Sequence, residues 1–218
     1  MRTYKAICFD FDYTLGDSTD SIVAGFQNGF RKLGWPEPDR ETVRGTVGFL
    51  LEDAYTMLTG DDKEENRARF RQYFIEVAME RQRKETKLFP YAAELLRMLQ
   101  ESGVKAGIVS TKRGDTIEII MENHHLRDQL ELVIGSADVK SHKPDPEGLL
   151  LAMERMGVKP EETLFCGDTV LDAGAAQNAG CDFAAVLNGT TEAAAFASFP
   201  CVYIASDLFA LRKWLGID

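Results

Sequence analysis

Four aspartates in this sequence stand at positions that indicate chemistry rather than solvation. Asp10 and Asp12 follow the apolar run "YKAICF", and Asp168 ends the run "TLFCGD", with Asp172 about one helical turn later. Burying an unpaired carboxylate is costly. Four carboxylates in one pocket would also repel one another and raise one another's pKa values. A hard divalent cation removes that conflict, and Mg²⁺ prefers one or two carboxylates completed by water or phosphate oxygens.

A lysine and two hydroxyl residues complete the candidate set. Lys143 lies in the loop "KSHKPDP", and Ser110 and Thr111 end the apolar run "VKAGIVS". An acidic cluster with one lysine predicts a Mg²⁺-phosphate site. Once the phosphate is neutralised there, a carboxylate can attack phosphorus and form an acyl-phosphate. A second carboxyl group can protonate the leaving oxygen and later deprotonate a water, while Ser110 and the backbone N–H groups beside it bind phosphate oxygens.

Alternating strand and helix patterns would bring these residues together. Short apolar runs predict strands at 4–11, 104–110, 131–136, 163–168, 182–188 and 201–205. Helical spacing of apolar residues marks 91–103, 114–124, 146–157 and 172–180. Strands that alternate with helices predict a mostly parallel sheet flanked by helices, that is, an α/β Rossmann-like core. Ligands of such sheets bind beyond the carboxyl ends of the strands, where the candidate residues stand.

The stretch from Ser18 to Lys87 interrupts this alternation because it is helical throughout. We therefore predict two domains. Residues 1–17 and 88–218 form the α/β core, and residues 18–87 form an inserted α-helical domain.

Composition limits the partners. The 218 residues carry a net charge of −10 and show no basic run, which argues against nucleic acid and against an anionic membrane. No apolar stretch of about 18 residues predicts a membrane span. The N-terminal segment does not match a signal peptide, so we expect a cytoplasmic protein with four reduced cysteines. Composition leaves a monomer and a homodimer equally open.

Taken together, four motifs resemble the haloacid dehalogenase superfamily in its phosphatase branch. They are "DFDYT" at 10–14, "IVST" at 108–111, "KPDP" at 143–146 and "GDTVLD" at 167–172, in the family's order. The helical insertion is similar to the cap of the phosphoglycolate-phosphatase-like subgroup. The resemblance implies a Mg²⁺-dependent phosphatase that hydrolyses a small phosphorylated metabolite through an aspartyl-phosphate.

The resemblance also implies a role for each residue. Asp10 would be the nucleophile and a metal ligand, and Asp12 the general acid/base, with its backbone carbonyl on the metal. Asp168 would bind Mg²⁺ directly, and Asp172 would support the metal through water or through Lys143. Lys143 would stabilise both the nucleophile and the transferring phosphoryl group. The remaining pair, Ser110 and Thr111, would bind the phosphoryl group.

Two residues depart from the family pattern, and three alternative functions remain open. Tyr13 stands where the family more often has glycine, and Ser110 replaces a common threonine. The Tyr13 side chain would either crowd the metal or point outward toward the cap. A phosphomutase, an inorganic pyrophosphatase and a non-catalytic phosphate-binding module could all use the same scaffold.

Overall fold

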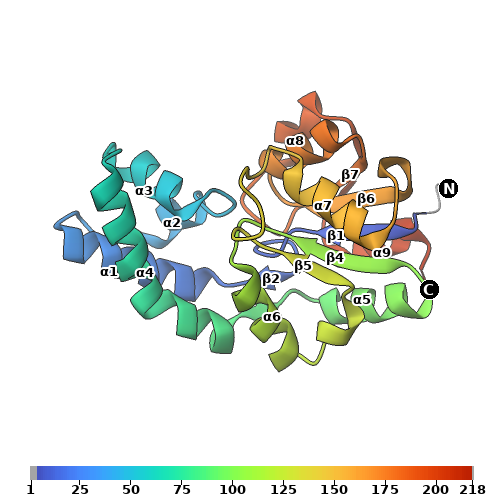
Figure 1. The fold of residues 1–218 in the computed structure, drawn as a ribbon, viewed down its shortest axis with the longest axis horizontal. Helices are drawn as coiled ribbons and strands as arrows, with labels where there is room; N and C mark the ends of the chain where they lie inside the picture. The colour runs from blue at the N-terminus through green and yellow to red at the C-terminus, as the bar shows by residue number, and fades with distance from the viewer. Residues whose placement is uncertain (1–3, 218) are drawn as a thin grey trace. The chain divides into compact units, whose positions relative to one another are not determined.

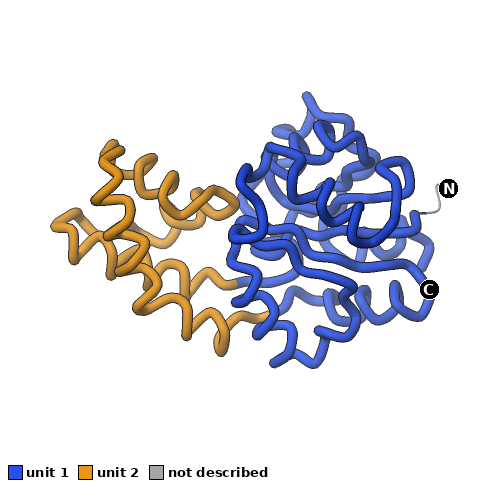
Figure 2. Tube along the Cα trace, viewed as in Figure 1, with its two compact units in different colours: residues 1–17, 88–218 blue, residues 18–87 orange. Residues whose placement is uncertain are grey.

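The structure, a computed structural model, describes residues 4–217. It divides into two compact units (Figure 2). The core unit comprises Met1–Asp17 and Leu88–Asp218, and the helical unit comprises Ser18–Lys87. The ends of the predicted core, residues 1–3 and 218, lie outside the described residues.

A six-stranded sheet forms the centre of the core unit, and every neighbouring pair of its strands is parallel (Figure 1). The strand order is β5-β4-β1-β6-β7-β8. Because β1 lies at the centre, between β4 and β6, the residues that follow these three strands are brought to one edge of the sheet. The strands are β1 (Ala6–Phe9), β4 (Lys105–Val109), β5 (Leu132–Ile134), β6 (Thr163–Gly167), β7 (Asp182–Val186) and β8 (Cys201–Ala205).

Helices cover both faces of this sheet, and each face has its own apolar cluster. Alternate residues of β1 point to opposite faces: Ile7 and Phe9 belong to one cluster, Ala6 and Cys8 to the other. The first cluster includes residues of α5 (Ala92–Glu101), α6 (Gly114–Asn123) and α9 (Leu208–Leu215), and the second includes residues of α7 (Glu147–Met156) and α8 (Val170–Ala179). Burial on both faces explains why the strands are almost wholly apolar.

The helical unit is built around aromatic side chains. Its helices are α1 (Thr19–Leu33), α2 (Arg40–Arg44), α3 (Leu51–Thr59) and α4 (Glu64–Glu85). Phe70 of α4 is fully buried, and its ring lies 5.2 Å from Phe26 and 4.9 Å from Tyr55, measured between centroids. Gly29 of α1 makes this packing possible, because a β-carbon there would lie only 2.5 Å from the Phe70 ring.

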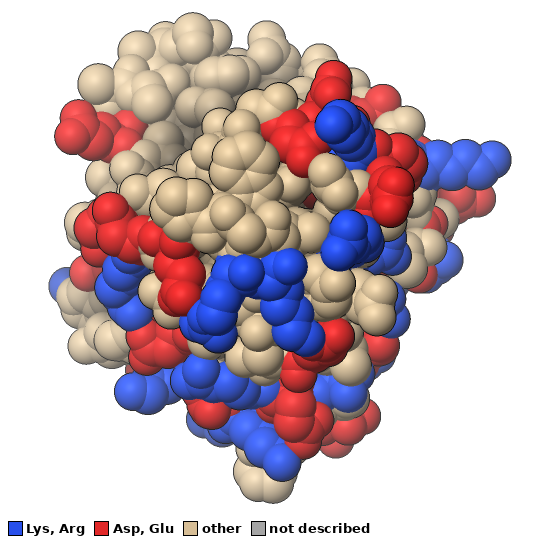
Figure 3. Space-filling model, turned by 90° about the vertical axis from the view of Figure 1, so that its left-hand side faces the viewer, with Lys and Arg blue, Asp and Glu red and all other residues tan. Residues whose placement is uncertain are grey.

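Ion pairs cover the exposed side of the helical unit. Arg67 pairs with Asp53, and Arg71 with Glu52. Figure 3 shows a face on which positive and negative side chains are intermingled beside a broad uncharged region. Exposed pairs of this kind contribute about 1 kcal/mol or less each, so the stability of the unit comes mainly from its aromatic core.

The predicted fold class is confirmed, and all six predicted strands are present. Three features were not predicted: the two-stranded ribbon of β2 (Gly16–Asp17) and β3 (Lys87–Leu88), helix α9, and short helix α2. Strands of two residues and a helix of five residues are too short to show a hydrophobic period. Short 3-10 turns occupy Arg127–Gln129, Pro160–Glu162 and Ala193–Ser198. Among residues 4–217, no helix combines the length and hydropathy that crossing a bilayer requires.

The glycine of α1 provides a test of the packing in the helical unit. We expect Gly29→Ala to lower the stability by about 1–3 kcal/mol, because overpacking against Phe70 outweighs the gain in helix propensity. Gly45→Ala is the matched control, since its β-carbon would meet nothing closer than 3.6 Å and its φ of −65° suits alanine. Thermal unfolding of both variants would measure the difference, and equal melting temperatures would contradict this account of α1.

Candidate active site

The carboxyl ends of two neighbouring strands present the first two aspartates. Asp10 follows β1 and Asp168 follows β6. The two strands are paired with Phe9 opposite Cys166, and the backbone N–H of Asp10 donates to the Cys166 carbonyl at 2.9 Å. This register places the two aspartates side by side beyond the sheet.

A third aspartate joins them from the first turn of α8. One carboxylate oxygen from each of Asp10, Asp168 and Asp172 can be chosen so that all three lie within 4.8 Å of one another. Their exposed fractions are only 2%, 2% and 0%. Three buried carboxylates at this separation repel one another strongly unless positive charge is close.

Lys143 supplies part of that charge. Its Nζ lies 3.0 Å from Asp10 Oδ1 and 2.5 Å from Asp172 Oδ1, and its side chain is 5% exposed. Burial by itself would lower the pKa of the Lys143 ammonium. The carboxylates of Asp10 and Asp172 outweigh that effect and raise this pKa above its ordinary value, so Lys143 stays charged.

The single charge of Lys143 does not neutralise the three carboxylates of Asp10, Asp168 and Asp172 (the trio). Burial raises the pKa of Asp10 to about 6, with Lys143 lowering it and Asp172 raising it. Burial, followed by the charges of Asp172 and Asp10, raises the pKa of Asp168 well above its usual range. Both raised pKa values indicate that the protein alone does not fully offset the negative charge of these two carboxylates. The donor set consists of clustered carboxylate oxygens, which fits a hard divalent cation such as Mg²⁺.

The hydrogen bonds of Asp172 distinguish it from the other two aspartates. Its Oδ1 faces Lys143, and its Oδ2 accepts from the N–H and the hydroxyl of Thr169 at 2.9 and 2.6 Å. Thr169 is the N-cap of α8, so Asp172 closes a capping box. Because both oxygens are already engaged, Asp172 is better placed to hold Lys143 than to bind an ion directly.

Two glycines leave room for the carboxylates. A β-carbon on Gly167 would lie 2.5 Å from the Asp172 side chain, and one on Gly189 would lie 2.1 Å from Asp168 Oδ2. Thr14 donates its hydroxyl to the other oxygen, Asp168 Oδ1, at 3.2 Å. Sequence reasoning missed Gly189. The available signal was a glycine in the turn that follows β7.

The loop that carries Lys143 is held at both ends. Before it, the carboxylate of Glu147 accepts from the N–H groups of Lys140 and Ser141 at 3.1 and 2.8 Å. After it, the Asn178 side chain of α8 donates to the Pro144 carbonyl at 2.9 Å. These bonds position the lysine between two aspartates even though it comes from a loop.

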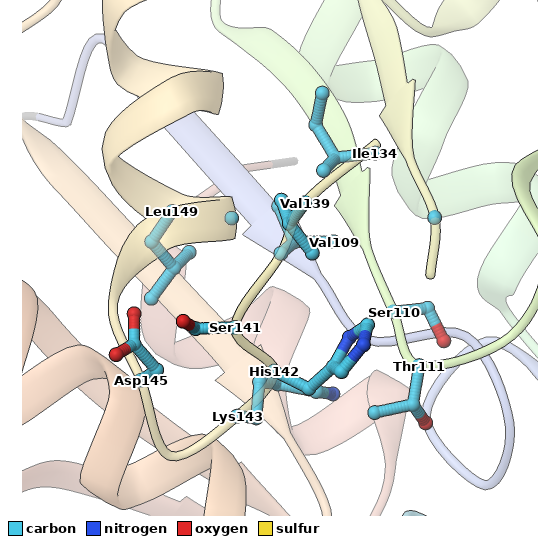
Figure 4. Close-up of a pocket in the computed structure, with 12 residues that line it drawn as sticks. Val109, Ser110, Thr111, Ile134, Val139, Ser141, His142, Lys143, Asp145 and Leu149 are labelled. Carbon is cyan, nitrogen blue, oxygen red and sulfur yellow. The ribbon is translucent and has the colours of Figure 1, made fainter. Parts of the chain in front are cut away.

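Ser110 and Thr111 face this loop from the end of β4. They line one pocket together with His142 and Lys143, and Figure 4 shows their side chains around it. The hydroxyl of Ser110 is buried and accepts from the Lys112 N–H at 3.3 Å. A hydroxyl and an ammonium group facing the same pocket are suited to binding an anion.

Asp12 lies apart from the trio, with a partner of its own. Lys112 Nζ lies 2.8 and 3.1 Å from its two carboxylate oxygens. Sequence reasoning missed Lys112, which directly follows Ser110 and Thr111. A basic residue immediately after the hydroxyl pair at a strand end was the available signal.

Tyr13 is buried, with 3% exposure, and has a left-handed φ of 60°. The two orientations predicted for its side chain, toward the metal or outward toward the cap, stay predictions. A β-carbon on Gly189 would lie 3.1 Å from Tyr13 Cβ, so Tyr13 packs beside the turn that borders Asp168. Left-handed backbone is unfavourable for tyrosine and is usually found where surrounding structure imposes it.

Comparison with known proteins agrees with this geometry. The family model of haloacid dehalogenase-like hydrolases matches residues 7–186. Phosphoglycolate phosphatase of Escherichia coli K12 is 32% identical over 202 residues, which covers 81% of this chain and 79% of that protein. The enzyme of the same name from Salmonella typhimurium is 32% identical over 212 residues, with 83% and 80% covered.

A solved structure is also similar over nearly the whole chain. A haloacid dehalogenase-like hydrolase from Bacteroides fragilis superimposes with a TM-score of 0.91 at 38% identity. The match covers 96% of this chain and all of that one. The resemblance seen in the four motifs is confirmed, and this chain belongs to the haloacid dehalogenase-like hydrolase family.

Proposed function

We propose that this hydrolase is a phosphatase that removes the phosphoryl group from a small phosphomonoester, with phosphoglycolate as the first substrate to test. The observation that carries the proposal is the buried trio of Asp10, Asp168 and Asp172, held against Lys143 at the carboxyl ends of β1 and β6. The curated relatives, which are named phosphoglycolate phosphatases, support the choice of substrate.

Asp10 is the proposed nucleophile. Its oxygen forms a bond to phosphorus while the ester P–O bond breaks, and the product is an aspartyl-phosphate. Lys143, 3.0 Å from Asp10, offsets the negative charge that the substrate brings to this carboxylate. Asp172 holds Lys143 there.

Asp12 is the proposed general acid and base. It gives its proton to the leaving oxygen in the first step, and in the second it takes a proton from the water that attacks the aspartyl-phosphate. The second step releases inorganic phosphate and restores Asp10. In both steps, Ser110 and Thr111 bind the phosphoryl oxygens from the end of β4.

The proposed cofactor is Mg²⁺, held by the carboxylates of Asp10 and Asp168 and the backbone carbonyl of Asp12, with Asp172 in support. When bound, it polarises the phosphoryl group and offsets charge that the two site lysines leave. We also propose that the helical unit Ser18–Lys87 is the cap domain that restricts substrate size.

A phosphomutase, a pyrophosphatase and a non-catalytic binding module remain the competing functions. Product analysis separates them: a mutase returns an isomeric sugar phosphate, a pyrophosphatase acts on pyrophosphate, and a binding module releases no phosphate from any ester.

The nucleophile is tested first. Asp10→Asn should lower phosphate release from p-nitrophenyl phosphate by more than about a thousandfold, because an amide cannot form the acyl-phosphate. Asp62→Asn, at an exposed position of the helical unit, should match the wild type. Activity retained in Asp10→Asn would refute the assignment of Asp10.

The metal site is tested without activity. Removing one of three repelling carboxylates by Asp168→Asn should raise the melting temperature of the metal-free protein at about pH 7.5, where the trio repels most strongly. The same variant should lose the stabilisation that Mg²⁺ gives the wild type. An undiminished Mg²⁺ shift in Asp168→Asn would exclude this carboxylate as a ligand.

The Mg²⁺ stabilisation should also depend on pH. Burial raises the pKa of Asp10 to about 6 in the metal-free protein. A cation must therefore displace a proton from Asp10 at about pH 5 but not at about pH 7.5, and the Mg²⁺-induced shift in melting temperature should be larger at the higher pH. Equal shifts at both pH values would contradict binding to this trio.

A further inference from the structure

The ion pair between Lys112 and Asp12 is largely shielded from solvent, though less than the carboxylate trio. The side chains are 6% and 13% exposed, and the ammonium contacts both carboxylate oxygens, at 2.8 and 3.1 Å. An ion pair between an exposed lysine and a carboxylate is mobile and is screened by solvent. A buried pair with both oxygens engaged fixes the rotation of the carboxylate.

The backbone of Lys112 is itself tied to neighbouring strand ends. Its N–H donates to the Ser110 hydroxyl at 3.3 Å, and its carbonyl accepts from the N–H of Ser136, beyond β5, at 3.0 Å. The ammonium also lies 5.8 Å from the centre of the Phe11 ring. Lys112 therefore links the ends of β1, β4 and β5 and has little freedom to leave Asp12.

Lys112 pairs with an aspartate outside the trio. Lys143 already contacts Asp10 and Asp172, and the carboxylate of Asp12 does not belong to the trio. The Lys112 ammonium contacts the Asp12 carboxylate and lies over the Phe11 ring, so it acts on Asp12.

We propose that Lys112 is a positioning residue that orients the Asp12 carboxylate for proton transfer to the leaving group. The inference rests on the proposed function, in which Asp12 is the general acid. Lys112 acts through geometry: it contacts both oxygens of the ionised Asp12 seen in the structure, and when Asp12 carries the proton that it donates, one oxygen stays on Lys112 while the protonated oxygen faces the leaving group. Its role is separate from phosphoryl binding, which the proposed function gives to Ser110, Thr111 and Lys143.

This role makes the effect of Lys112 depend on the leaving group. An alkyl alcohol leaves slowly without a proton, so hydrolysis of phosphoglycolate needs a well-placed acid. The p-nitrophenolate ion leaves without one. General acid catalysis raises the reaction rate by about 10²–10⁴-fold, and a misaligned acid loses part of this acceleration.

The test compares kcat/KM for the two substrates in Lys112→Met, because kcat/KM reports the steps through release of the leaving group and not the later hydrolysis of the aspartyl-phosphate. We expect a loss of about 10-fold to 100-fold with phosphoglycolate and less than about 3-fold with p-nitrophenyl phosphate. Lys112→Arg, which can still contact both oxygens, should recover most of the phosphoglycolate activity. Lys213→Met, at an exposed position of α9, is the matched control and should not change the ratio.

An Asp12→Asn background shows whether Lys112 acts through Asp12. Adding Lys112→Met to Asp12→Asn should cost little further activity, because the residue that Lys112 orients is already lost. Full additivity of the two losses would overturn the proposal, and so would equal losses on both substrates. If Lys112→Met does not fold, Lys112→Gln carries the same comparison. A wild-type protein that hydrolyses neither ester would instead refute the proposed function.

Discussion

Buried negative charge is the constraint on which this active-site region depends. Asp10, Asp168 and Asp172 are almost wholly shielded from water and lie within 4.8 Å of one another. Repulsion of this kind destabilises the fold unless cations oppose it, and Lys143 alone opposes three carboxylates. The raised pKa values of Asp10 and Asp168 express the remaining imbalance. A site that is strained without a cation is suited to bind one.

Close backbone packing allows this arrangement. Gly167 leaves room for the Asp172 side chain, and Gly189 for the Asp168 carboxylate. Gly174 does the same for the lysine loop, because a β-carbon there would lie 2.9 Å from Pro144 Cβ. Small residues around the site thus bring helix α8 and two loops against the strand ends, and the polar side chains meet at fixed distances.

The two lysines of the site pair with different aspartates. Lys143 serves the trio, and Lys112 serves Asp12, so the proposed nucleophile and the proposed acid each have a separate lysine. If all four aspartates are ionised, the two lysines leave a charge of −2, which one divalent cation would cancel.

Local pattern in the sequence determined the α/β class, the six strands and the candidate residues at their ends. Apolar runs have a clear period, and a polar residue that ends such a run is visible without a structure. The partnership of Lys112 with Asp12, 100 positions away, was decided only in the tertiary structure, as was the closeness of Gly189 to Asp168. Both contacts depend on which strands become neighbours. The residues around a lysine or a glycine in the sequence do not indicate which distant residue it will contact. Strand order, not residue type, makes them part of the site.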